Sequence, residues 1–72
     1  MNKSETREVQ KARAYLTHFE ATRDPAILGI IARTMGALVR ATRTDKARIE
    51  LMAEADALGV SGHSDFIVAR WA

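Results

Sequence analysis

The chain has 72 residues, a net charge of +2 and no cysteine. This length suits one folding unit, so we expect a single domain over residues 1–72. Without cysteine there are no disulfides, and two histidines make a structural zinc site improbable, so no metal or cofactor is predicted. A chain this small builds only a thin core, and a partner subunit is the remaining source of extra stability.

The charges are unevenly distributed. Residues 1–43 carry eight basic and four acidic side chains, whereas residues 44–72 carry three and five. Eight of the eleven cations are arginine, whose planar guanidinium suits phosphate and carboxylate groups. The first ten residues are polar and the longest mostly apolar stretch, residues 26–32, is too short to cross a membrane. We therefore predict a cytoplasmic protein without membrane association. The arginine excess favours an anionic partner, and compositional drift unrelated to function is the alternative.

A first helix is predicted over about residues 5–22. Apolar side chains recur there at spacings of three and four, as an amphipathic helix requires: Val9, Ala12, Leu16 and Phe19. Ser4 is expected to cap its N-terminus. Asp24 and Pro25 then mark a sharp reversal, because Asp caps the next helix and Pro fits its first position.

A second helix is predicted over about residues 25–41. It is apolar around most of its circumference and should therefore be central. Its narrow polar strip consists of Gly29, Arg33, Gly36 and Arg40. Glycine is unfavourable inside a helix, and three explanations stay open. The strip is solvated, or another helix packs on it and the arginines pair with Glu50 or Glu54, or a phosphate backbone approaches it.

A third helix is predicted over about residues 45–58, with Thr44 as N-cap and Gly59 as the residue that ends it. Val60 would make the hydrophobic contact of a Schellman ending. A short fourth helix over about residues 65–71 would be capped by Ser64, although Ile67 and Val68 also tolerate a strand. Residues 38–44 could likewise be a helix end or a strand.

The expected fold class is therefore all-α: a small bundle of three helices plus a short C-terminal helix, forming a dimer. The predicted core is Leu16, Phe19, Ile27, Ile31, Leu38, Leu51 and Leu58. The second helix has more apolar surface than one antiparallel neighbour covers, so a homodimer is expected to bury the surplus. The predicted dimer interface is Leu28, Met35, Val39, Phe66, Ile67 and Trp71.

Few residues suit catalysis. His18 falls on the polar face of the first helix. His63 lies close to Ser61, Ser64 and Asp65, but side chains so near in sequence rarely converge as a triad does. We predict that the chain is not an enzyme.

Two stretches of the C-terminal half resemble DNA-binding modules. Residues 54–61 look like the first helix and turn of a helix-turn-helix, with Ala55 at the helix crossing and Gly59 opening the turn. Residues 40–68 are similar to ribbon-helix-helix antitoxins and repressors, with Ser64-Asp65-Phe66 opening the second helix. That resemblance implies a strand near residues 39–43 that pairs with its twin in a dimer and enters the major groove.

The sequence thus favours a small DNA-associated regulator, of the repressor or antitoxin kind, acting as a homodimer. Its predicted nucleic-acid contacts are Arg33, Arg40, Arg43, Lys11 and Arg13. The alternative is a protein-interaction or adaptor module that binds no nucleic acid, with its basic half against an acidic protein partner.

Overall fold

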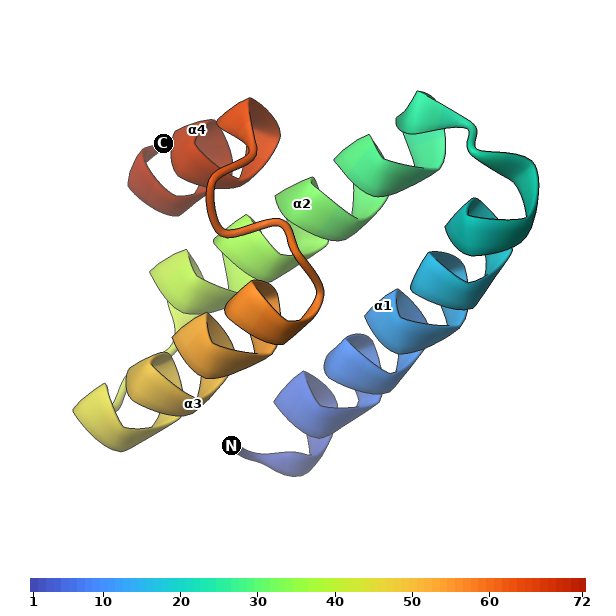
Figure 1. The fold of residues 1–72 in the computed structure, drawn as a ribbon. Helices are drawn as coiled ribbons and strands as arrows, with labels where there is room; N and C mark the ends of the chain where they lie inside the picture. Colours follow the sequence, from blue (N-terminus) through green and yellow to red (C-terminus); the bar gives the residue numbers. More distant parts are fainter.

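The computed structural model describes all 72 residues, which form four helices and no strand (Figure 1). The helices, in chain order, are α1 (Lys3–Thr22), α2 (Pro25–Ala41), α3 (Asp45–Ala57) and α4 (Ser64–Trp71). The all-α class and the count of three longer helices plus one short one are confirmed. Residues 39–41 are the last turn of α2, so the strand implied by the ribbon-helix-helix resemblance is not formed.

Each helix begins at a side chain that accepts a hydrogen bond from a free backbone N–H group of the first turn. Asp24 caps α2, where Pro25 takes the first position, and Thr44 caps α3, both as predicted. The other two predicted caps are wrong by one or two residues. Asn2, not Ser4, caps α1, and His63, not Ser64, caps α4.

Two left-handed residues set the turns between helices. Gly59 has φ +78° and follows α3. The N–H of Val60 donates to the carbonyl of Ala55 and that of Gly59 to the carbonyl of Asp56, both at 3.0 Å, which is the predicted Schellman ending. Arg23 ends α1 at φ 59°, an unusual conformation for a residue with a side chain.

Helix α2 is the centre of the fold, with α1, α3 and α4 packed around it (Figure 1). The core therefore takes side chains from all four helices and from the turn at Val60. It consists of Val9, Ala12, Ile27, Ile31, Ala32, Met35, Val39, Leu51, Ala55, Leu58, Val60 and Phe66. Ile31, Met35 and Leu51 are fully buried, and the central position predicted for the second helix is confirmed.

The glycines of α2 lie under α4. A methyl group added at Gly36 would fall 2.6 Å from the carbonyl oxygen of Phe66 and 2.7 Å from the Cβ of Ala69. Backbone of α4 therefore approaches α2 at a distance that only glycine permits. Of the three explanations for the glycine strip, helix packing is the one the structure shows, and the packed helix is α4.

The burial of individual apolar residues differs from the prediction in two ways. Leu16, Phe19 and Leu38 are only partly buried against the core. Met35, Val39 and Phe66, predicted at a dimer interface, are 0%, 2% and 1% exposed inside the single chain. They cannot contact a second copy, because α4 packs on the surface of α2 that was expected to need a partner, and this packing buries side chains of both helices.

Candidate nucleic-acid interface

A small groove lies where the end of α2 meets α3 and α4. Its volume is about 190 Å³, and it is lined by Val39, Arg40, Arg48, Arg70 and Trp71. Val39 belongs to the core and provides an apolar floor. The other four side chains are three arginines and a tryptophan, and no carboxylate lines the groove. Such a lining suits a flat, negatively charged ligand.

Each arginine is brought to the groove by a different helix. Arg40 comes from the last turn of α2 and forms no ion pair. Arg48 comes from α3, where it donates hydrogen bonds to the carboxylate of Asp45 at 2.7 Å and to the carbonyl oxygen of Thr42 at 3.2 Å. The Asp45 side chain is 95% exposed, so solvent screening weakens the ion pair between Asp45 and Arg48.

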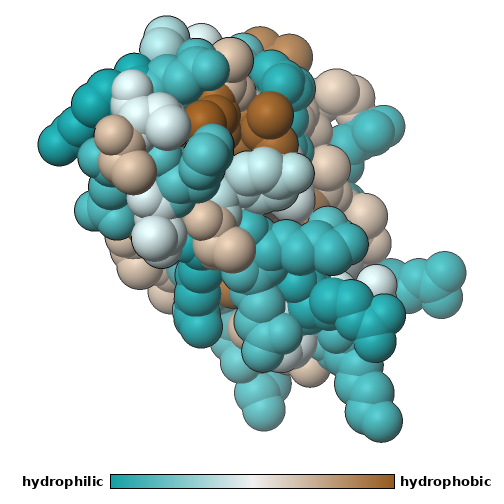
Figure 2. Space-filling view, turned by 90° about the vertical axis from the view of Figure 1, so that its right-hand side faces the viewer, coloured by the Kyte–Doolittle hydropathy of each residue, from teal (hydrophilic) through white to brown (hydrophobic).

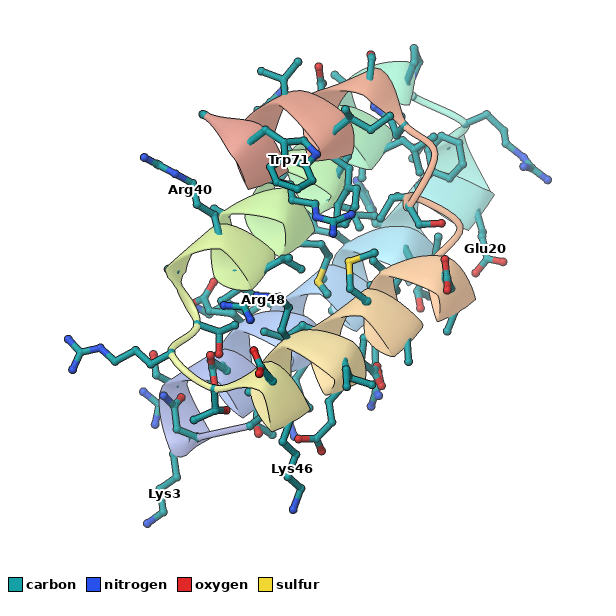
Figure 3. All side chains as sticks on the ribbon, turned by 90° about the vertical axis from the view of Figure 1, so that its left-hand side faces the viewer. Lys3, Glu20, Arg40, Lys46, Arg48 and Trp71 are labelled. Carbon is teal, nitrogen blue, oxygen red and sulfur yellow. The ribbon has the colours of Figure 1, made fainter.

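The third arginine, Arg70, lies beside the tryptophan on α4. Its guanidinium carbon is 4.7 Å from the centre of the Trp71 ring. Trp71 is nevertheless 72% exposed, so much of its flat surface remains in solvent. Figure 3 shows Trp71 and Arg48 on the same side of the molecule, with Arg40 projecting at its edge.

The five predicted nucleic-acid contacts do not come together. Three of them have a carboxylate partner: Lys11 with Glu8 at 3.3 Å, Arg13 with Glu54 at 2.5 Å, and Arg33 with Asp65 at 3.1 Å. Glu54 raises the pKa of Arg13 through this hydrogen bond. Only Arg40 lines the groove.

The predicted pairing of the strip arginines with α3 is wrong. Arg33 pairs with Asp65 at the start of α4, and Arg40 pairs with no carboxylate. Two acidic side chains of α3 form ion pairs with other groups. Glu50 accepts a hydrogen bond from the N-terminal ammonium at 3.0 Å, and Glu54 accepts one from Arg13. The strip is thus an interface with α4, joined at its edge by one exposed ion pair.

Arg43 lines a second, larger hollow, of about 400 Å³, between the start of α1 and the loop before α3. This hollow contains the carboxylate of Glu5, whose backbone and side chain exchange hydrogen bonds with Asn2 at 2.8 and 2.9 Å. The hydrogen bond from the Asn2 backbone is the main cause that lowers the pKa of Glu5 below its ordinary 4.5, and one from the Thr42 side chain lowers it further. A charged carboxylate makes this hollow a poor place for an anion.

Neither histidine has the surroundings of a catalytic group. The Nδ1 atom of His63 accepts the N–H of Asp65 at 3.0 Å and so caps α4. His18 lies exposed on α1, in a shallow depression with Lys11, Ala14 and Tyr15. No three His, Asp or Glu side chains gather as a metal-ligand set.

The side seen in Figure 2 is mainly hydrophilic, with a small apolar area near the top of the view. Three of the six exposed large apolar residues lie on α4, where Ile67 is 47% and Val68 67% exposed in addition to Trp71, and Ile49 on α3 is 69% exposed. None of the helices has the length and apolar composition needed to span a bilayer.

No family model, curated protein or solved structure matches the chain. The resemblances to DNA-binding modules therefore have no support beyond the sequence patterns that suggested them.

Arg48 and Arg70 were missed as functional candidates, and Trp71 was assigned only to a dimer interface. Arg70 and Trp71 are far from Arg40 in sequence, and Arg48 lies on the next helix, so the four side chains meet only because α3 and α4 both pack against α2. The one local signal was the adjacent pair Arg70 and Trp71, in which a cation can lie over an aromatic ring.

Proposed function

We propose that this chain is a small DNA-associated regulator that holds the phosphate backbone in the groove between α2, α3 and α4. The observation that carries the proposal is the meeting of Arg40, Arg48 and Arg70 around one hollow without a carboxylate in its lining. The only carboxylate that pairs with these three arginines is exposed Asp45, which contacts Arg48, so the hollow keeps an excess of positive charge that attracts an anion. Phosphate, like carboxylate, fits the planar donor fork of arginine through pairs of hydrogen bonds.

Further basic side chains lie outside the groove. Lys3 and Lys46 project into solvent from the side that Figure 3 shows, below Arg40 and Arg48. Glu20 lies at the opposite end. A polyanion seated in the groove could therefore reach additional cations along the same side, whereas a single small anion could not.

A salt titration tests the proposal. Three released counterions give log Kd a slope of about 2 on log salt for a single strand and about 2.7 for a duplex, which weakens binding roughly 20- to 40-fold between 50 and 200 mM. We expect this dependence in fluorescence-anisotropy titrations of labelled oligonucleotides. Arg40→Gln should weaken binding and lower the slope by nearly one unit.

Arg23→Gln is the matched control. It removes the same charge just before the other end of α2, and the stretch of α2 from Pro25 to Arg40 alone rises roughly 23 Å at 1.5 Å per residue. It should leave affinity and slope nearly unchanged. Equal losses from both substitutions would mean that only net charge matters, and no binding at low salt would refute the proposed function.

The exposed apolar residues of α4 favour a second function, protein contact. Ile67 and Val68 lie on the outer side of this helix, away from Phe66, which anchors it in the core. We propose a second copy of the chain as the partner, since pairing through α4 would place two grooves on one dimer. Light scattering of the wild type and of Val68→Glu tests this: a dimer that the substitution disperses supports it, and a monomeric wild type at high concentration refutes it.

A further inference from the structure

We propose that the groove accepts an unpaired base, stacked on Trp71, and that its ligand is therefore a single-stranded polynucleotide. This inference rests on the proposed function and narrows it. It adds to phosphate contact a second element of recognition, the flat face of the indole ring.

The size of the groove fits one base. An apolar cavity of about 150 Å³ holds a benzene ring, and this groove measures about 190 Å³ and is open to solvent. Its floor is the buried side chain of Val39, and Trp71 forms one side. A planar base can thus be removed from water by contact with two apolar surfaces, while the arginines contact the phosphates on either side of that nucleotide.

The exposure of Trp71 is the second observation. Tryptophan is the largest apolar side chain, and leaving 72% of it in water forgoes much of the stabilisation that burial would give. Arg70 covers one face of the ring, with its guanidinium carbon 4.7 Å from the ring centre, so the exposed remainder of the ring is what a nucleobase can stack on. Proteins that bind single strands combine such stacking platforms with a basic groove.

A duplex is a less suitable ligand for this arrangement. Its bases are stacked on each other inside the helix and present only their edges in the grooves. A hollow with an aromatic wall receives a group that projects from the ligand, and in a single strand each base can project. The Trp71 ring could stack on a base of a duplex only after two stacked base pairs separate, which costs a few kcal/mol per step.

The experiment uses the full chain and labelled oligomers of about 12 nucleotides, within the usual range of site sizes. The probes are a thymidine strand, a uridine strand, the thymidine strand paired with its complement, and an abasic strand that carries phosphates without bases. Because the chain has one tryptophan, its intrinsic fluorescence reports directly on Trp71. The variants are Trp71→Leu and, as a matched control, Tyr15→Leu, which changes another exposed aromatic residue on α1.

We expect the wild type to bind both base-carrying single strands more tightly than the duplex and the abasic strand, and these two strands to quench its tryptophan fluorescence. Trp71→Leu should weaken binding of the thymidine strand by about 5- to 150-fold and leave the abasic strand unaffected, because it removes the stacking platform and no charge. Tyr15→Leu should behave as the wild type. A preference for only one of the two strands would identify DNA or RNA as the natural source.

Two results would overturn the inference, and they differ in what they imply for the proposed function. Salt-dependent binding in which the duplex competes equally and the tryptophan is not quenched refutes base stacking and leaves phosphate contact intact. Failure of every probe to bind at low salt refutes both. The fluorescence of the wild type decides between these outcomes even if a variant does not fold.

Discussion

The close approach of α4 to α2 makes Gly36→Ala the most informative substitution for the fold. The added methyl carbon would lie 2.6 Å from the Phe66 carbonyl oxygen, 2.7 Å from the Ala69 Cβ and 3.1 Å from the Arg70 backbone nitrogen. Carbon atoms in good contact are about 3.5 to 4.0 Å apart, so α4 must move outward by roughly 1 Å. Two of these three atoms belong to the backbone, and no change of side-chain rotamer relieves the clash.

The expected magnitude is the difference of two effects. Overpacking typically costs about 1 to 3 kcal/mol, and a clash with two backbone atoms lies in the upper part of this range, about 2 to 3 kcal/mol, whereas alanine is favoured over glycine inside a helix by about 1 kcal/mol. We therefore expect Gly36→Ala to lower the free energy of unfolding by about 1 to 2 kcal/mol. For a domain of this size that lowers Tm by roughly 4 to 16 °C.

Gly29→Ala on the same face is the control. Its methyl group would meet the ends of two flexible side chains, Asp65 at 2.9 Å and Arg33 at 3.3 Å, which can turn away. Their exposed ion pair contributes at most about 1 kcal/mol, similar to the gain in helix propensity. This variant should be as stable as the wild type or more so in thermal denaturation followed by circular dichroism. If Gly36→Ala proved as stable as Gly29→Ala, the packing of α4 on α2 would be wrong.

Three further predictions concern stability. Because the pKa of Glu5 is lowered in the folded chain, its charged form stabilises the protein above about pH 4.5 and this contribution is lost as the pH falls through the folded pKa. The stability difference between the wild type and Glu5→Gln should thus shrink on acidification in urea titrations, and a constant difference would contradict it. Arg23→Gly should raise Tm, because glycine adopts the left-handed conformation without the cost of about 1 to 2 kcal/mol that a residue with a side chain has there. The gain is reduced by the stabilisation lost when the Arg23 guanidinium no longer contacts the Phe19 ring. A lower Tm would show that this contact outweighs the strain. Met35→Ala should lower the free energy of unfolding by about 2 to 5 kcal/mol, because Met35 is fully buried. Leu38→Ala should lower it clearly less, because Leu38 is only half-buried, and equal midpoints of urea denaturation for the two variants would refute this order.

Local signals in the sequence predicted most of the fold. Asp24 with Pro25, Thr44 and Gly59 each act on the backbone within a few residues, and each ends or begins a helix where expected. The start of α1 was missed, although Asn2 followed three residues later by Glu5 is the pattern of a capping box. The signal for this cap was therefore present in the first five residues of the sequence.

The position of α4 could not be predicted in the same way. Glycine on one face of α2 is compatible with solvent, a helix or a ligand, and only the full packing decides among them. Once α4 occupies that face, the centre of the core moves to Met35 and Val39, and Leu38 is left half-buried. The groove depends on the same event, because Arg70 and Trp71 reach Arg40 only through the packing of α4.

The most direct test of the groove as a nucleic-acid site is an NMR titration of the labelled protein with a single-stranded oligonucleotide. The signals to follow are the indole N–H of Trp71 and the guanidinium N–H groups of Arg40, Arg48 and Arg70. We expect these four to shift together and saturate at one concentration, while the backbone signals of Lys11 and Tyr15 on α1 stay in place. Shifts centred on α1, or none in the groove at saturating ligand, would contradict the proposed site.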